Sequence, residues 1–328
     1  MKMQHISREG KSSDITFLVQ NMTWSGDVAE AARRVELTLA VSSLDHYLPQ
    51  VAMDLGEKLV FSTDEGKELW QGFIFQKNRS LNGSEFKVTA FDGLIYLTKS
   101  KLPRLFNGMT PERVTAAVCA ELGVPVGQLS VTNLPQTFAN QDGGGGKSGY
   151  EAIMTSYSSA SKQNGKVYMA RMDKGALDVV EKGAVVAQTE LTASTNLTDA
   201  SYGEDMSAMV NTVIITDEMG NTIDQVRNSD WLKNYGLLQE VYQKEEEKDP
   251  KKMAEAMLHG IDRTASVELI GGPDKYDLIA GNAVRIKEDV TGITGLFYID
   301  RDTHTFQGGQ HKISLDLNYK NVMEEHEA

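Results

Sequence analysis

The 328-residue sequence contains a single cysteine, Cys119, and therefore cannot form an internal disulfide. This excludes the disulfide framework that stabilises many small secreted domains. The first twenty residues are polar and charged, without the apolar segment of a signal peptide. No apolar run approaches the roughly 18 residues that a membrane helix needs. These absences predict a protein that is made in a cytoplasm and does not cross a membrane.

Positive charge is also scarce. The chain has 33 Lys and Arg against 46 Asp and Glu, a formal net charge of −13. Such an acidic chain repels phosphate backbones and anionic lipid surfaces. We therefore expect no stable nucleic-acid binding and no membrane adsorption, although the same balance also fits a merely soluble acidic protein.

The first hundred residues have the pattern of short β-strands separated by Gly, Asp and Asn. Within residues 34–41, apolar and polar residues alternate, which is typical of a strand with one buried face. Segments rich in β-branched and aromatic residues continue this pattern at 15–19, 35–41, 59–62, 69–75 and 86–91. Short strands at this spacing predict a small β-barrel or sandwich over residues 1–98.

Helix signals appear in the middle of the chain. Thr110 and Pro111 begin one predicted helix and Gly123 ends it, while Ser148 caps a second helix that runs to about Ser161. A hairpin is expected to turn at 173–175, and residues 141–146 are expected to form a flexible link. Residues 99–191 are thus predicted to form a small α+β module.

The β pattern returns over residues 192–328. Candidate strands are 212–216, 237–242, 267–270, 283–287, 296–300 and 312–317. Asp249 and Pro250 begin a helix that interrupts them, with Met253, Met257 and Ile261 expected on one face. The predicted fold class is α+β, mainly β: two related β-barrel domains, 1–98 and 192–328, separated by the module 99–191.

The two β regions repeat one another in the same order. Trp24, Asp27 and Val35 match Tyr202, Asp205 and Val213 with identical spacing. Three further matches follow: 56–61 with 281–286, 72–75 with 295–299, and 86–90 with 312–316. Each match alone is weak, because glycine before an apolar strand is common, and two unrelated β domains are the alternative. Four matches in collinear order predict an internal duplication, with an insertion in the second copy.

Several strings of residues resemble one known protein family. In the first region they are Trp24-Ser25-Gly26 with Arg33, Glu68-Leu69-Trp70-Gln71-Gly72, and Asp92-Gly93-Leu94-Ile95-Tyr96-Leu97. In the second region they are Tyr235-Gly236-Leu237-Leu238-Gln239, Gly295-Leu296-Phe297-Tyr298-Ile299 and Thr303-His304-Thr305-Phe306. Together they cover nearly the whole chain and are similar to the XkdQ/YqbQ-like proteins of PBSX-type prophages.

This resemblance implies a structural protein, the central hub of a contractile tail baseplate in a phage virion or a tail-derived bacteriocin. It implies a homotrimer that caps the tail tube, carries the central spike and contacts other baseplate proteins. It also implies kinship with the base of type VI secretion spikes, which are contractile injection systems. Three chains with two similar barrels each would present six similar positions, as a joint between a sixfold tube and a threefold spike requires. The residues leave open whether the parent particle carries DNA.

We assign no catalytic, cofactor-binding or metal-binding residues. Gly146-Lys147-Ser148 has the end of a phosphate-binding loop, but Gln141 occupies the position of its first glycine, so a linker is favoured. None of the six histidines has zinc-ligand spacing, and His304 is expected to bond hydroxyls or backbone. Cys119 is interpreted as a core residue of its helix, and the Asp300/Asp302 pair as part of a turn.

Two other functions compete with the structural hub. A tail-associated peptidoglycan hydrolase is the alternative, since a Cys119–histidine pair could hydrolyse if an electropositive setting activated the thiol. The sequence disfavours it because no nucleophile–base set or zinc motif is evident. A carbohydrate- or receptor-binding module is the other candidate, and the sequence lacks the repeats typical of such fibres. The chain is therefore predicted not to be an enzyme.

Overall fold

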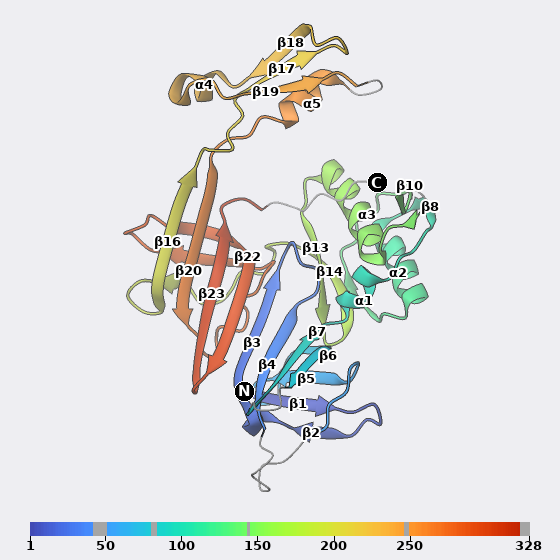
Figure 1. Cartoon of the computed structure of the whole chain (residues 1–328), viewed down its shortest axis with the longest axis vertical. Helices are drawn as coiled ribbons and strands as arrows, with labels where there is room; N and C mark the ends of the chain where they lie inside the picture. Colours follow the sequence, from blue (N-terminus) through green and yellow to red (C-terminus); the bar gives the residue numbers. More distant parts are fainter. Residues whose placement is uncertain (42–50, 80–83, 143–144, 246–248, 322–328) are drawn as a thin grey trace. The chain divides into compact units, whose positions relative to one another are not determined.

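The computed structural model describes residues 1–41, 51–79, 84–142, 145–245 and 249–321 (Figure 1). The chain is mainly β, with 48% strand and 17% helix in several sheets, which confirms the predicted predominance of strands. It divides into a large unit, Met1–Ala200 with Ser266–Ala328, and a small unit, Ser201–Ala265. Throughout the described ranges, no helix has the length and apolar character required to cross a membrane.

A sheet of 13 strands contains residues from both ends of the chain. The first region contributes β1 (Lys2–Ile6), β2 (Ser12–Asp14), β3 (Val19–Asp27), β4 (Arg34–Ala40), β5 (Lys58–Ser62), β6 (Glu68–Arg79) and β7 (Glu85–Phe91), with the 3-10 helix η1 (Thr16–Leu18) before β3. The last region contributes β15 (Leu191–Thr192), β16 (Leu197–Asp205), β20 (Asp262–Ile270), β21 (Ala283–Lys287), β22 (Thr294–Gln307) and β23 (Gln310–Asn318). The order is β16-β20-β23-β22-β3-β4-β7-β6-β5-β1-β2, and β21 pairs with β22 and β15.

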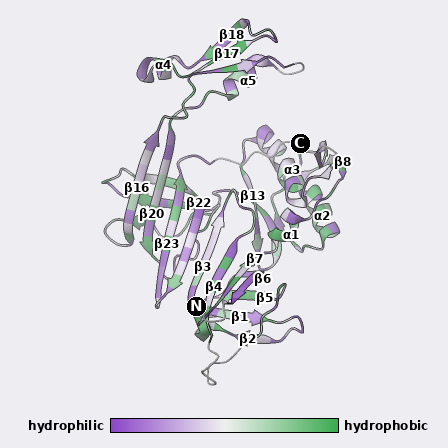
Figure 2. Ribbon diagram, in the orientation of Figure 1, coloured by the Kyte–Doolittle hydropathy of each residue, from purple (hydrophilic) through white to green (hydrophobic). Residues whose placement is uncertain are grey.

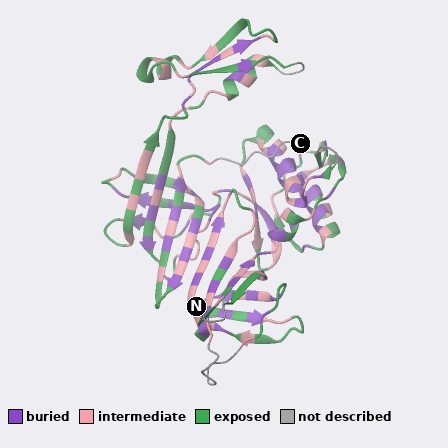
Figure 3. Cartoon of the chain, in the orientation of Figure 1, coloured by how far each residue is buried: buried purple, intermediate pink, exposed green. Residues whose placement is uncertain are grey.

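Alternating sequence explains why these segments form strands with one buried face. In β4, Val35, Leu37 and Leu39 are buried while the residues between them are not. The alternation of hydropathy and of burial along the strands can be followed in Figures 2 and 3. The buried side chains pack with Trp24 and Phe61 in one core of the first β region.

The strand order of the first β region recurs in the second. Reading across the sheet, β3-β4-β7-β6-β5 corresponds in order to β16-β20-β23-β22-β21. Each set ends on a strand that continues the sheet, β1 next to β5 and β15 next to β21. This correspondence of topology agrees with the repeat seen in the sequence.

Individual hydrogen bonds recur as well. The N–H of Gly56 donates to the carbonyl of Ile74 at 2.7 Å, and the N–H of Gly281 donates to that of Ile299 at 2.9 Å. Both glycines have positive φ, +83° and +89°, which residues with a Cβ rarely adopt. The register between β6 and β7 shifts directly after Ile74, and that between β22 and β23 shifts directly after Ile299. The two regions therefore share the position of a β-bulge.

Three details of the predicted repeat differ from the structure. Val213 lies on a strand of the small unit, and the counterpart of β4 is instead β20. The equivalence of Ile74 with Ile299 shifts the match of Gly72 with Gly295 by two residues. Ala90 pairs with Ile74 as Leu317 pairs with Ile299, so the counterpart of Ala90 is Leu317 and not residue 316. No closed barrel is found among the described residues, since both β regions belong to one open sheet. The domain boundaries at 98/99 and 191/192 stay a prediction.

The middle of the chain forms a compact α+β part of the large unit, with its own core around Phe106, Val118 and Tyr157. Its helices are α1 (Leu94–Lys99), α2 (Pro111–Leu122) and α3 (Gly149–Asn164). Its strands are β8 (Leu105–Met109), β9 (Val126–Leu129), β10 (Gln136–Ala139), β11 (Gln141–Asp142), β12 (Gly145–Gly146), β13 (Tyr168–Asp173) and β14 (Ala176–Glu181). They form the sheets β10-β8, β11-β12 and β13-β14-β9.

The helix ends of this part confirm the sequence signals. Pro111 opens α2, and Gly123 ends it in the left-handed conformation with φ +69°. The Ser148 side chain accepts a hydrogen bond from the Glu151 N–H, and the Glu151 side chain accepts one from the Ser148 N–H, a complete capping box. The hairpin β13–β14 turns where predicted, with Asp173 paired to Ala176.

The small unit is an insertion between β16 and β20. It contains β17 (Thr212–Thr216), β18 (Thr222–Arg227), α4 (Ser229–Tyr235), β19 (Gln239–Gln243) and α5 (Pro250–Ala256), with strand order β18-β17-β19. Val213, Ile215 and Ala254 are buried in its core. The Asp249 side chain caps α5 as predicted, but the helix ends at Ala256, so the prediction that Ile261 continues its face is wrong.

Candidate functional site

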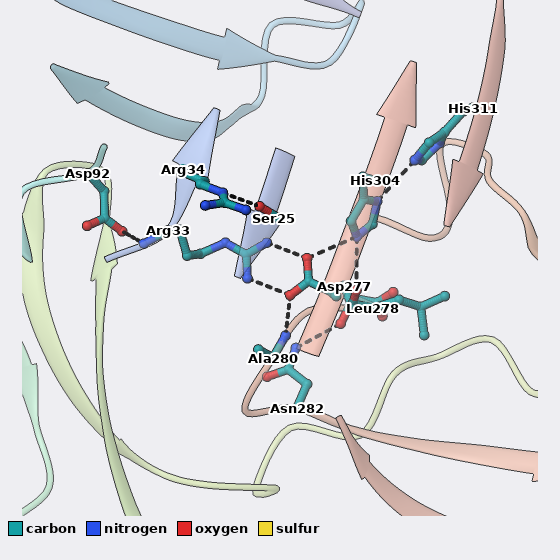
Figure 4. A network of polar contacts seen from close by, with 11 residues as sticks. Ser25, Arg33, Arg34, Asp92, Asp277, Leu278, Ala280, Asn282, His304 and His311 are labelled. Carbon is teal, nitrogen blue, oxygen red and sulfur yellow. Dashed lines mark hydrogen bonds and ion pairs between the residues drawn. The ribbon is translucent and has the colours of Figure 1, made fainter. Parts of the chain in front are cut away.

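The two β regions are joined by direct strand pairing, which we call the seam. Residues Arg301–Gln307 of β22 pair antiparallel with Asn21–Asp27 of β3. The earlier residues of β22, Thr294–Tyr298, pair with β21 in its own region. One strand thus belongs to both regions, and polar side chains gather where it passes from one to the other (Figure 4).

A buried ion pair lies at the seam. Arg33, between β3 and β4, donates from its two terminal nitrogens to the Asp302 carboxylate at 2.7 and 2.6 Å. The Asp302 side chain is fully buried and that of Arg33 is 12% exposed. The backbone N–H of Ala280 also donates to Asp302, at 2.6 Å, and the Arg33 guanidinium lies 4.5 Å from the Trp24 ring centroid. Three donors therefore satisfy a carboxylate that would be costly to bury alone.

Two histidines extend this network. His304 Nε2 lies 3.0 Å from the Leu278 carbonyl, and His304 Nδ1 lies 3.0 Å from His311 Nε2. A carbonyl oxygen can only accept, so His304 Nε2 donates. When the His304 ring is neutral, its Nδ1 accepts from His311 Nε2. Burial lowers the pKa of His304. Burial, together with the neighbouring His304, lowers the pKa of His311 to about 3.

Asp92 connects the network to the middle of the chain. Its carboxylate accepts from the backbone N–H of Arg33 at 3.2 Å and from that of Leu94 at 3.0 Å. Complete burial raises the pKa of Asp92 to about 7, although both hydrogen bonds oppose the shift. The start of α1 is thereby fixed beside β4.

The groups at the seam are bonded mainly to one another. Asp302 has three donors, and His304 bonds on both ring nitrogens. A cavity of about 240 Å³ lies beside them, lined in part by Trp24, Arg33 and Asp277. No described hydroxyl or thiol is bonded to either histidine. This arrangement suits the fixing of two β regions against each other rather than proton transfer to a substrate.

The thiol that the hydrolase alternative would require is not activated. Cys119 is fully buried in the core of the middle part, and burial raises the pKa of its thiol to about 11. A thiol with this pKa stays protonated near neutral pH and is a poor nucleophile. The interpretation of Cys119 as a core residue is confirmed.

The Gly146-Lys147-Ser148 segment belongs to a short β-ladder and to the start of α3. Gln141 and Asp142 pair with Gly146 and Gly145 in a short ladder, so the prediction of a flexible link is wrong for them. Residues 143 and 144 lie outside the described residues. The side chains of Ser148 and Glu151 bond the backbone N–H groups at the start of α3, the groups that a phosphate-binding loop would offer to its ligand.

The expectation for His304 is confirmed, because one of its partners is the Leu278 carbonyl. In the described ranges, no cluster of three or more His, Cys, Asp or Glu side chains is placed to hold a metal ion. The roles of Arg33, Asp302 and His311 were not predicted. For Asp302 the sequence held one signal, its spacing of two residues from His304 and four from Phe306. This spacing places all three side chains on the side of β22 that faces the core. The Asp300/Asp302 pair lies within that strand, so its interpretation as a turn is wrong.

Curated relatives align along nearly the full chain. The protein YqbQ of Bacillus subtilis (strain 168) is 23% identical over 316 residues, covering 94% of each chain. The phage-like element PBSX protein XkdQ of the same strain is 21% identical over 322 residues, covering 95% of each chain.

Solved structures with a similar fold include tail proteins and a PdpA–VgrG complex. The 43 kDa tail protein of prophage MuSo2 from Shewanella oneidensis has a TM-score of 0.72 at 13% identity, with 97% of each chain covered. A tail protein of Neisseria meningitidis MC58 has a TM-score of 0.67 at 14% identity, covering 96% of this chain and 95% of that one. In a Francisella PdpA–VgrG complex, the match covers all of this chain and 53% of the other, with a TM-score of 0.59 at 11% identity.

These similarities show that the chain has the fold of phage tail proteins. The name of XkdQ describes a phage-like element protein, and the Shewanella and Neisseria structures are described as tail proteins. A family model described as YQBQ-like matches residues 22–318, and the chain therefore belongs to the YQBQ-like family.

Proposed function

We propose that this chain is the central hub of a contractile tail baseplate, a homotrimer that joins the sixfold tail tube to the threefold spike. The observation that carries the proposal is the repeated strand order, in which β3-β4-β7-β6-β5 corresponds to β16-β20-β23-β22-β21. Two similar β regions in one chain give six similar positions in a trimer. A ring of this kind meets a sixfold tube on one side while keeping threefold symmetry for the spike on the other.

The seam supports a rigid joint. Seven residues of β22 pair with β3, and the buried Arg33–Asp302 ion pair crosses the same place. Both β regions are thereby held in one sheet within each chain. In a hub, the shared sheet would transmit force between neighbouring positions of the ring without movement of one β region against the other inside a subunit.

The proposal also includes the division into hub domains 1–98 and 192–328 with the module 99–191 between them. The proposed role is not enzymatic. This is supported by the Cys119 thiol, which is buried with a raised pKa, and by His304, which is bonded on both nitrogens. The partners would be the tail tube, the central spike and other baseplate proteins. The particle would be a virion or a headless tail-like bacteriocin.

Deleting the gene in the bacterium that encodes the chain, and imaging the tails it makes, tests this function. We expect tails without the chain to lack a baseplate and spike, and complementation to restore both. Quantitative mass spectrometry of purified tails is expected to give three copies per particle. Normal tails in the deletion strain, or six copies per tail, would contradict the proposal. A zymogram on peptidoglycan checks the hydrolase alternative, which a clearing band abolished by Cys119→Ser would support.

A further inference from the structure

The repeat predicts a second seam that one chain cannot form by itself. In the observed seam, β22 pairs with β3. The counterpart of β22 in the first region is β6, and the counterpart of β3 in the second region is β16. The equivalent pairing would therefore join β6 to β16. These two strands are not neighbours in the sheet of a single chain.

The exposed edge of β6 begins at the shared bulge. Beyond Ile299, β22 continues as Arg301–Gln307 and pairs with β3 on the side away from β23. Beyond Ile74, β6 continues in the same way as Gln76–Arg79, with β7 on one side. All four of these residues are exposed. Within the described ranges, no strand pairs with the other side of these four residues, because the pairing of β6 with β5 ends at Phe73.

The edge of β16 offers the matching strand. β16 stands at the end of the sheet order, with β20 as its neighbour. It has nine residues, as β3 has, and both strands end in an aspartate three residues after an aromatic residue. The neighbouring strands are equivalent too. The Val41 N–H donates to Ser84 in the first region at 2.9 Å, as the Gly271 N–H donates to His311 in the second at 2.8 Å.

We propose that the free edge of β6 pairs antiparallel with β16 of a second copy of this chain. This inference rests on the proposed function, for which it defines the contact between subunits. The seam fixes the register. Arg301 is paired with Asp27, Asp302 with Gly26 and His304 with Trp24. The equivalent pairs between copies are Gln76 with Asp205, Lys77 with Glu204, and Arg79 with Tyr202.

The charges of the two edges are complementary. Gln76–Arg79 contains two cations, Lys77 and Arg79, whereas Tyr202–Asp205 ends in two carboxylates. In the seam, the His304 ring lies tilted at 4.9 Å from the Trp24 ring. In the contact between copies, Arg79 would face Tyr202 at this position, and a cation over an aromatic ring is favourable. Opposite charges on facing strands stabilise a pairing and oppose the wrong register.

Partners within the chain do not prevent this contact. Lys77 pairs with Asp54 at 2.7 Å, and Glu204 pairs with Arg263 at 3.0 Å. Both pairs are solvent-exposed, with Lys77 36% and Glu204 45% exposed. Exposed ion pairs contribute little to stability, so these side chains can exchange partners at low cost. Charged residues also keep an open edge from pairing indiscriminately before assembly.

Cysteine cross-linking of the full-length chain tests the register. Gln76→Cys in one preparation and Asp205→Cys in another place thiols on opposite residues, whose Cβ atoms would lie about 5 Å apart. The natural Cys119 is buried and does not compete. The matched control mixes Gln76→Cys with Ser201→Cys, which lies about 13 Å further along β16. A disulfide accumulates even when the encounter is brief, so weak association of the isolated chain does not hide the contact.

We expect mass spectrometry of the oxidised mixture to show the 76–205 linkage at a yield at least about tenfold above the 76–201 linkage. Equal yields, or no 76–205 linkage, would overturn the proposed pairing. Adding Lys77→Glu to the first preparation should lower the yield by about threefold, and Glu204→Lys in the second should restore it. Asp54→Asn is the control, because it removes the counter-charge of Lys77 within the chain, keeps the hydrogen bond from Lys77 to the Met53 carbonyl, and leaves the contact between copies intact.

The two proposals fail separately. Three copies per tail without a 76–205 linkage would leave the hub in place and reject the β6–β16 contact. A specific 76–205 linkage in a chain that is absent from purified tails would keep the contact and reject the hub.

Discussion

At the scale of single residues, we expect the stability of the large unit to depend strongly on the buried Arg33–Asp302 pair. Replacing Asp302 by Asn keeps the shape but leaves the Arg33 guanidinium buried without its counter-charge. We expect Asp302→Asn to lower the free energy of unfolding by about 3 kcal/mol, measured by urea denaturation at neutral pH.

The adjacent Arg301 provides the control for this change. Its ion pair with Asp27 is exposed on the arginine side, at 58%. Arg301→Gln should cost less than about 1 kcal/mol. If the two variants were equally stable, the buried pair would not hold the β regions together.

The histidine pair predicts a dependence of stability on pH. Both rings are neutral in the fold, and the pKa of each is lowered, that of His311 to about 3. The unfolded chain, in which histidine has a pKa of about 6.5, therefore binds more protons at intermediate pH. The stabilisation is fully present above pH 6.5 and is lost as the pH falls from there toward 3.

Asp92 has the opposite effect on the pH dependence of stability, and a histidine variant can separate the two contributions. Its pKa is raised to about 7, so the fold binds its proton more tightly than the unfolded chain does, and acidification below 7 favours the fold. His311→Gln removes one histidine and keeps a donor toward His304. We expect its free energy of unfolding to fall less than that of the wild type between pH 6.5 and 4.5. The exposed His259, changed to Gln, is the control, and equal slopes in all three proteins would contradict the assignment.

At the scale of elements, the equivalent glycines Gly56 and Gly281 provide a matched pair. Both have positive φ, so alanine is strained at either position by about 1 kcal/mol. A Cβ at Gly56 would meet nothing within 4 Å, whereas one at Gly281 would lie 2.0 Å from the sulfur of Met169. Gly281→Ala should therefore cost about 1–3 kcal/mol more than Gly56→Ala.

A double-mutant cycle with Met169→Ala checks the cause. The extra cost of Gly281→Ala should disappear in the Met169→Ala background, as measured by thermal or urea unfolding. An unchanged cost would mean that backbone strain, and not the sulfur contact, separates the two glycines.

Elements with local signals were predictable from the sequence. The side-chain caps Ser148 and Asp249, the start of α2 at Pro111 and the turn at 173–175 depend on residues within a few positions of one another. Thr110 precedes α2 as predicted, but its side chain makes no capping hydrogen bond. Strands with a weak pattern were not predicted. β16 contains Thr, Asp and Ser with little alternation, and β18 is exposed at nearly every residue. Helix α4 has no buried residue, so no periodicity marks it.

At the scale of the whole molecule, the small unit is an insertion into one copy of the repeat. β3 and β4 are connected by residues 28–33, whereas β16 and β20 are connected by residues 206–261. The small unit has a separate core around Val213 and Ile215. Replacing 206–261 with the sequence of 28–33 should leave the large unit folded, because its sheet is complete without that core.

Circular dichroism and thermal unfolding measure this outcome. We expect one cooperative transition whose midpoint lies within about 5 °C of that of the large unit in the intact chain. Loss of a cooperative transition would show that the small unit supports the sheet. Shortening the β22–β23 turn, which belongs to the sheet itself, should in contrast destabilise the chain.

The sequence by itself determined the mainly β class, the helix caps, the collinear repeat and the resemblance to the family, because these depend on patterns close along the chain. Only the tertiary structure decided that the two β regions share one sheet. It also decided that the insertion lies along the chain between β16 and β20, which are neighbours in that sheet. The bond between Arg33 and Asp302 joins residues 269 positions apart. No local pattern specifies such a pairing, since the guanidinium and the carboxylate come together only when the two β regions pack in the folded chain.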